Sequence, residues 1–328
     1  MRARPDGESA QSCRVKVRGH LLLAALAAGI VPTTLPAAPI LLGQAATVYA
    51  TATNPMELAF GADGSLYVGR DTNSNTYLQR VPAGGGAASS WGSRSVYDPD
   101  GLAYFDGNVY ACGEGEVVSA DAGTGAMSQW VALAGRNPTT MTVDVSGDYG
   151  AVGDVFVGSA RHNSDIEWIP AAGRTPVTLV SSLDLFIPRG LLFASGELYC
   201  VESSETKGIW QIGPTGALRF VDDGGFSWSQ PSELAYHKGE DAFYVADADR
   251  GTIHRVPRAG GLPESIGEGF GEIRGMAFGP GGYLYISDVT SDVIWRALPE
   301  PTAAGLLAVG VLLILRRSRR RPVGGRGL

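Results

Sequence analysis

The sequence predicts an all-β fold, a six-bladed β-propeller over residues 46–298. The main observation is a repeated frame: six segments carry a large apolar residue three positions after a proline, or after an isoleucine in the sixth copy, at intervals of 39 to 50 residues. The apolar positions are Leu58, Leu102, Met141, Leu191, Leu234 and Met276. The 46 glycines and 5 methionines of the chain indicate many turns and few long helices. Four-stranded units that repeat every 40–45 residues are typical of propeller blades.

Each unit has the strand pattern of one blade. A short apolar strand begins at the frame proline, a Gly-rich turn follows, and an alternating strand such as Leu66-Tyr67-Val68 comes next. A third strand then follows, for example TYLQRVP in the first unit or VIWRA in the sixth. The sixth unit has no fourth strand before residue 299. We expect residues 46–52 (ATVYATA) to supply it, because pairing the two ends of the repeat region removes exposed sheet edges.

The charge of the chain is unevenly distributed. The formal net charge is −7, but residues 21–315 hold 15 basic and 31 acidic residues, so this part carries −16. An acidic surface of this size argues against nucleic acid and anionic membrane as partners of the propeller. It is compatible with cations as ligands, and with solubility outside the cell.

The three cysteines do not indicate a framework of disulfide bonds. Cys13 lies in a basic leader, and Cys112 and Cys200 belong to the second and fourth repeat units. Because a whole blade separates these units, we expect both thiols to be free. The spacing also excludes a C-x-x-C metal site.

The first 45 residues have the order of a secretory signal peptide and leader. A basic stretch at residues 14–20 precedes eleven apolar residues, Leu21–Val31, and small residues follow. A buried helix is the alternative, but basic, apolar and small residues in this order favour export.

The last 30 residues, 299–328, predict a membrane stop. Pro299, Glu300 and Pro301 form an extended stretch, and Ala303–Leu315 is a run of thirteen apolar residues. This run is shorter than the roughly 18–20 residues of a stable transmembrane helix, although snorkelling side chains can extend it. Five arginines follow and should stay in the cytoplasm by the positive-inside rule. They are Arg316, Arg317, Arg319, Arg320 and Arg321.

The tail closely resembles the PEP-CTERM sorting signal of Gram-negative bacteria. The resemblance covers about the last 25 residues and implies export across the inner membrane and processing by an exosortase at or near the Pro299-Glu300-Pro301 motif, after removal of the leader by signal peptidase. Proteins of this kind typically accompany exopolysaccharide or surface-layer production. The resemblance therefore implies a place in the cell envelope, at the surface or in the extracellular matrix. A plain C-terminal anchor is the alternative.

The repeats of residues 46–298 resemble NHL-type and SMP-30/gluconolactonase-like six-bladed propellers. SMP-30-type enzymes bind one metal ion through a glutamate, an asparagine and an aspartate from different blades. Glu57 begins the first inner strand and could serve as the glutamate. The asparagine has no convincing counterpart, and the motif around the aspartate is not reproduced. The resemblance therefore supports the fold more than the activity, and no residue is assigned as catalytic.

Two sets of polar residues are expected at one mouth of the central channel, because the inner strands begin and the second strands end there. The first set is Glu57, Asp100, Arg189, Glu233 and Arg274, and the second is Asp71, Glu202, Asp247, Asp249 and Asp288. Together they could hold Ca²⁺, another divalent cation or a polar ligand. The alternative for the second set is that its carboxylates accept hydrogen bonds from turns.

The sequence thus favours an exported, sorted propeller that binds or scaffolds exopolysaccharide or another surface protein without catalysis. The second hypothesis is a metal-dependent, SMP-30-like lactonase or related hydrolase with Glu57 as a ligand. Convergent oxygen ligands at the channel mouth would distinguish the two.

Overall fold

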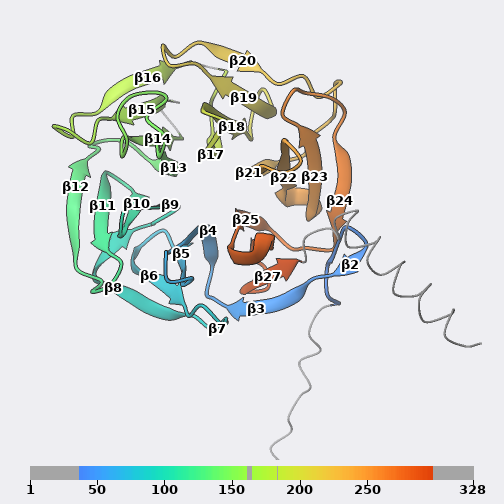
Figure 1. Cartoon of the computed structure of the whole chain (residues 1–328), viewed down its shortest axis with the longest axis horizontal. Coiled ribbons are helices and arrows are strands. Elements are labelled where there is room, and N and C mark those ends of the chain that lie inside the picture. Colours follow the sequence, from blue (N-terminus) through green and yellow to red (C-terminus); the bar gives the residue numbers. More distant parts are fainter. Residues whose placement is uncertain (1–36, 161–164, 183, 298–328) are drawn as a thin grey trace, which may run out of the picture. The chain divides into compact units, whose positions relative to one another are not determined.

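The computed structural model describes residues 37–160, 165–182 and 184–297. The described chain folds into six antiparallel sheets placed around a central channel (Figure 1). Each sheet has at least four strands, and four of its strands run outward from the channel. The six-bladed propeller expected from the repeats is confirmed.

The strands of the first three blades, from the channel outward, are as follows. Blade one contains β4 (Pro55–Phe60), β5 (Leu66–Arg70), β6 (Asn75–Val81) and β8 (Ser89–Tyr97). Blade two contains β9 (Gly101–Phe105), β10 (Asn108–Gly113), β11 (Glu116–Asp121) and β12 (Met127–Ala132). Blade three contains β13 (Pro138–Val143), β14 (Val155–Ser159), β15 (Asp165–Ile169) and β16 (Val177–Ser181).

The last three blades follow the same order. Blade four contains β17 (Pro188–Ala194), β18 (Glu197–Glu202), β19 (Gly208–Ile212) and β20 (Leu218–Phe220). Blade five contains β21 (Pro231–His237), β22 (Ala242–Asp247), β23 (Thr252–Pro257) and β24 (Glu264–Glu268). Blade six contains β25 (Ile273–Phe278), β26 (Leu284–Asp288), β27 (Val293–Ala297) and β3 (Thr47–Thr51). Two single-turn 3₁₀ helices, η1 (Ala248–Arg250) and η2 (Pro280–Gly282), lie between strands.

The ring closes in the sixth blade. Strand β3 pairs antiparallel with β27, with Thr51 opposite Val293 and Ala50 opposite Ile294. The inner strand β25 contacts β4, as each inner strand contacts the next around the ring. The expectation that residues 46–52 supply the missing strand is therefore confirmed. A two-residue strand, β7 (Gly86–Ala87), adds to β3 in parallel.

The described propeller begins before residue 46. Strands β1 (Ile40–Leu41) and β2 (Gln44–Ala45) form a small hairpin, and β1 pairs with the outer strand β24 of the fifth blade. These residues were expected to belong to the leader. Their apolar side chains, such as the buried Leu41, pack onto the edge of this blade.

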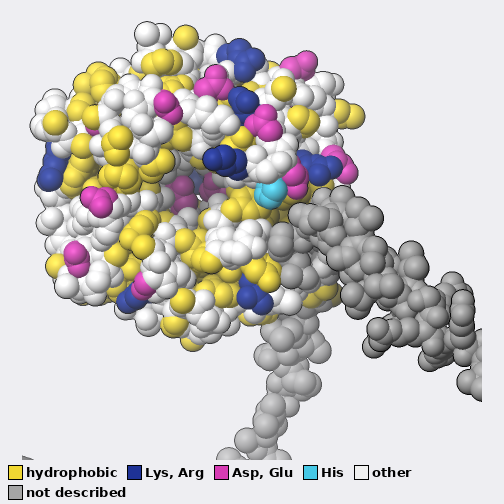
Figure 2. All heavy atoms as spheres, in the orientation of Figure 1, with side chains coloured by type: hydrophobic (Ala, Val, Ile, Leu, Met, Phe, Trp, Pro, Cys, Tyr) yellow, Lys and Arg dark blue, Asp and Glu magenta, His cyan; other side chains and the backbone are white. Residues whose placement is uncertain are grey.

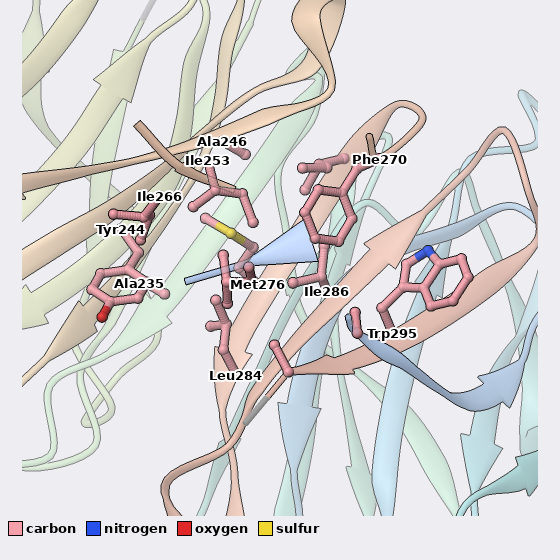
Figure 3. Close-up of a cluster of buried hydrophobic side chains, with 14 of the residues drawn as sticks. Ala235, Tyr244, Ala246, Ile253, Ile266, Phe270, Met276, Leu284, Ile286 and Trp295 are labelled. Carbon is pink, nitrogen blue, oxygen red and sulfur yellow. The ribbon is translucent and has the colours of Figure 1, made fainter. Parts of the chain in front are cut away.

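The hydrophobic core lies between neighbouring blades. Between blades five and six, Tyr244 and Ile253 of one sheet face Met276 and Ile286 of the next, and Phe270 of the connecting segment joins them (Figure 3). The apolar residues of the repeated frame are all buried, at 1–6% exposure. The alternating pattern therefore gives each sheet two apolar faces, which stacking against both neighbours removes from water.

Both predicted ends lie outside the described residues. The proposed signal peptide, the Pro-Glu-Pro motif, the apolar run and the arginines fall at positions 1–36 and 298–328. Within the described ranges, no helix has the length and apolar character needed to cross a membrane. Cys112 and Cys200 are both buried and free, as predicted.

Candidate functional site

A polar chamber opens at the mouth where the inner strands begin. Its volume is about 480 Å³, within the range of small-molecule sites. Loops and strand ends of the first four blades form its walls. The lining residues are Asp71, Asn73, Tyr97, Asp98, Asp100, Glu114, Gly135, Arg136, Asn137, Thr139, Ala160, Ile187 and Arg189.

Asp100 is the most unusual side chain of the chamber. It precedes β9, is only 8% exposed, and its Oδ1 atom has no hydrogen-bond partner among the described residues. Burial raises the pKa of Asp100 to about 7; the nearby Arg189 charge opposes this shift, and Asp98 and Asp71 add to it. A buried acceptor without a partner is costly, so an oxygen in this position points to a ligand or an ordered water. The pKa near 7 makes the carboxyl able to accept and donate a proton at neutral pH.

Arg189 supplies positive charge next to this carboxyl. Burial lowers the pKa of Arg189, the Arg274 charge lowers it further, and the Asp100, Glu233 and Asp71 charges raise it. None of the described acids forms an ion pair with Arg189. Its guanidinium therefore keeps its donors for an anionic or carbonyl-bearing ligand. Arg274, by contrast, is held by Glu272, which accepts a hydrogen bond from Arg274 Nε at 2.7 Å.

Glu57 and Glu233 lie deeper, at the middle of the channel. The backbone N–H of Leu102 donates to Glu57 Oε2 at 2.9 Å, and that of Leu234 donates to Glu233 Oε1 at 2.8 Å. Burial and then the charge of Glu233 raise the pKa of Glu57 well above its usual range. Burial raises the pKa of Glu233 to about 8, and Arg189 and Arg274 oppose this shift. The Glu233 carboxyl is therefore mostly protonated at neutral pH, and burial shifts the pKa of Glu57 in the same direction.

A glycine makes room for this arrangement. Gly190, next to Arg189, has φ +54°, and a Cβ atom there would lie 2.5 Å from the Leu234 nitrogen and 2.7 Å from Glu233 Oε1. Any larger residue would displace the Glu233 carboxyl or strain the backbone of β17. The glycine of the IPRGLLF segment thus positions the acid on the neighbouring blade.

The first predicted set comes together in the structure. Charges within this set act on the pKa values of Glu57, Asp100, Arg189 and Glu233, and Arg274 is one of the charges that act on the last three. Their role in binding stays a prediction.

The second set separates. Asp71 lines the chamber, but the other members lie outside its lining and accept hydrogen bonds from nearby loops. The Glu202 carboxylate accepts from the N–H groups of Ile187 and Ser204, and Asp247 accepts from Ser229 and Gln230.

Asp288 accepts from the N–H groups of Gly271 and Ser291, and Asp249 accepts from the Ser229 hydroxyl. These carboxylates organise the loops between blades, as in Asx turns. The turn-capping alternative for the second set therefore holds for Glu202, Asp247 and Asp288, whereas Asp249 accepts only from a side-chain hydroxyl.

Glu57 does not have the surroundings expected of an SMP-30-type metal ligand. Within the described residues, no group of three or more His, Cys, Asp or Glu side chains lies together in a way that could hold a metal ion. Glu57, the one candidate ligand, accepts the Leu102 N–H, and burial raises its pKa well above the usual range, which disfavours the ionised form that a metal ion needs. A metal ligand must be an ionised carboxylate with a free lone pair. Glu57 instead satisfies the backbone of the neighbouring inner strand.

Sequence reasoning missed several chamber residues. Asp98 and Asn137 line the chamber, and each stands directly before the proline of its repeat frame. That position was visible in the alignment of the six units and could have indicated them. Glu114 and Arg136 belong to loops that do not repeat, so no pattern pointed to them. Arg136 forms an ion pair with Glu167 at 2.6 Å.

The chain was compared with known proteins. No family model matches it, and no curated protein is significantly similar in sequence. Among solved structures, a gluconolactonase from Xanthomonas campestris has a TM-score of 0.63 and 16% identity, over 80% of this chain and 96% of that chain. The calcium-binding protein regucalcin from Agrobacterium tumefaciens has a TM-score of 0.61 and 13% identity, over 80% and 93%.

An oxidoreductase described as a glucose dehydrogenase, from Thermus thermophilus, has a TM-score of 0.60 and 19% identity, over 77% of this chain and 99% of that chain. At these identities the similarity establishes the fold alone. The chain is a six-bladed propeller whose structural neighbours include proteins of the SMP-30/gluconolactonase type.

Proposed function

We propose that the polar chamber binds and hydrolyses a small polar ester, and that the substrate class is the internal ester, or lactone, of a sugar acid. Asp100 carries this proposal: it is a buried carboxyl with an unpartnered oxygen, a pKa of about 7 and an arginine beside it, in a chamber of small-molecule size. The structural similarity to a gluconolactonase favours this hydrolase over a purely structural scaffold.

The chemistry needs one base and one cation. Ionised Asp100 takes a proton from a water molecule whose oxygen attacks the ester carbonyl carbon. The Arg189 guanidinium stabilises the negative charge that develops on the carbonyl oxygen. The ring C–O bond then breaks, and Asp100 returns the proton to the leaving alkoxide, which gives the hydroxy acid. No step in this scheme uses a metal ion, in keeping with the donor set of the channel.

The test is hydrolysis of δ-gluconolactone followed at constant pH and corrected for the spontaneous reaction. We expect Asp100→Asn to lower kcat/KM by about 10²–10⁴-fold, the usual contribution of an acid–base group. Asp249→Asn is the matched control, because Asp249 is exposed and lies outside the chamber. A wild-type rate equal to the spontaneous rate would reject the hydrolase, and lactone binding without turnover would assign the chamber to a binding protein.

We also propose that the chain is exported and sorted through its tail. The support is the order of Pro299-Glu300-Pro301, the apolar run and the five arginines, together with the basic-apolar-small order of residues 14–45. In this proposal signal peptidase and an exosortase process the two ends. The propeller then acts in the envelope or extracellular matrix, where polysaccharide or surface proteins would be its neighbours.

A further inference from the structure

A second cavity lies at the opposite end of the central channel. Its volume is about 460 Å³, and the end portions of all six inner strands line it. Most of its wall is aliphatic or aromatic, and five rings contribute: Phe60, Tyr104, Phe193, Tyr236 and Phe278. Figure 2 shows a face of the ring on which hydrophobic side chains surround a central hollow and acidic side chains lie within it.

Two carboxyls are the only acidic or basic groups, apart from tyrosine, among the residues that line this cavity. They are Glu57 of β4 and Glu233 of β21. An apolar pocket with a few convergent polar groups is the usual form of a small-molecule site. The proposed hydrolysis uses neither carboxyl. Each carboxyl accepts one backbone N–H on one of its two oxygen atoms, which leaves further acceptor capacity for a ligand.

The charges around this pair favour a cation. Asp100 raises the pKa of Glu57, whereas Arg189 of β17 and Arg274 of β25 lower the pKa of Glu233. Arg274 is already paired with Glu272. The two remaining inner strands, β9 and β13, present to the cavity only uncharged residues such as Tyr104 and Thr142. Three carboxyls, those of Glu57, Glu233 and Asp100, thus face one guanidinium that no described acid pairs with, Arg189. A bound cation would favour the ionised form of Glu233, whose pKa burial raises to about 8.

We propose that this cavity is a second binding site, which takes an organic ammonium ion with an alkyl or aryl body. The ammonium group donates hydrogen bonds to Glu57 and Glu233, while the body packs against the apolar wall. The aromatic rings add cation–π attraction near the head group. The site is independent of the proposed lactone hydrolysis, because it lies at the other end of the channel and takes a ligand of opposite character.

The test is isothermal titration of the purified chain at neutral pH with three probes of one length: hexylammonium, hexanol and hexanoate. We expect hexylammonium to bind at least tenfold more tightly than hexanol, and hexanoate to bind most weakly. Binding of hexylammonium should release protons, seen as a dependence of the heat on the ionisation enthalpy of the buffer. Equal binding of hexanol and hexylammonium, or no binding of any probe at millimolar concentration, would overturn the proposal.

Three variants test the position of the head group. Glu233→Gln keeps the acceptor for the Leu234 N–H and should weaken hexylammonium at least tenfold without weakening hexanol. Val145→Arg adds a positive charge at a 61% exposed position of the lining, where folding is not at risk, and should also weaken hexylammonium alone. Glu205→Gln, exposed and outside the cavity, is the matched control and should change nothing. Hexylammonium affinity that is unchanged in both Glu233→Gln and Val145→Arg would place the ligand elsewhere and refute the assignment.

Discussion

Replacing Tyr49 by alanine should weaken ring closure strongly. Tyr49 lies in β3, is 8% exposed, and packs edge-to-face on Tyr285 with ring centroids 4.8 Å apart. Its hydroxyl donates to the carbonyl oxygens of Pro82 and Ala83 at 3.2 and 3.0 Å, so the side chain ties blade six to blade one. Removing a buried aromatic side chain typically costs about 3–5 kcal/mol. Tyr49→Phe, which loses only the hydroxyl, should cost about 1 kcal/mol.

The assay is urea unfolding of the chain, with thermal unfolding as a second measurement. A loss of about 3–5 kcal/mol in a protein of this size corresponds to roughly 6–20 °C in Tm. Val48→Ala is the matched control, because Val48 is the neighbouring residue of the same strand but is 47% exposed. Its effect should stay within about 0.5 kcal/mol. If Tyr49→Ala and Val48→Ala destabilise the chain equally, burial of β3 does not hold the ring closed and the reasoning fails.

Three further predictions concern sulfur, pH and the tail. Cys112 and Cys200 should react with a thiol reagent only after unfolding, because both are buried and unpaired; fast reaction of the folded chain would contradict this. The pKa of Glu233 is about 8 in the folded state against about 4.3 in the unfolded state, so the folded state binds more protons and this group's contribution to stability falls as pH rises from about 4 to 8. The free energy of unfolding of Glu233→Gln, relative to that of the wild type, should therefore rise between pH 5 and pH 8, by at most about 1.4 kcal/mol per pH unit. If urea unfolding gives the same difference between the two proteins at every pH, this prediction is wrong. Glu300→Ala should leave membrane insertion intact yet block C-terminal processing in a host with an exosortase, as intact mass would show; loss of the tail from the variant would exclude Glu300 from recognition.

The fold was predictable because the repeat frame marks one physical position. In every unit the frame proline or isoleucine lies within two residues of the start of an inner strand. The apolar residue three positions later is buried on that strand. Closure of the ring by β3 could be predicted because the sixth repeat unit holds only three of the four strands that a blade needs. The β1–β2 hairpin did not follow, because residues 40–45 continue the apolar and small composition of the leader, and only the edge of β24 identifies their partner.

The site was predictable only where topology alone places a residue. The start of each inner strand faces the same mouth, so Asp100 and Arg189 could be grouped from their positions in the repeat. Whether a carboxylate serves a ligand or the backbone depends on which N–H groups are free nearby, and the sequence does not show this. Glu202 ends the second strand of its blade and Asp71 directly follows the second strand of its own, yet Glu202 accepts hydrogen bonds from a turn and Asp71 lines the chamber.

The two mouths of the channel differ because inner strands begin in loops and end in hairpins. At the starting mouth the chain arrives from the outer strand of the previous blade, and connections of three and five residues carry the polar residues Asp98 and Asn137 to the chamber. At the other mouth, short turns connect β9 to β10 and β17 to β18, so strand residues such as Tyr104 and Phe193 form the wall themselves. Glu57 and Glu233 stand between the two regions, where inner-strand N–H groups need acceptors. The acids at the centre of the channel thus satisfy the backbone first, and this leaves the chamber above them to Asp100 and Arg189.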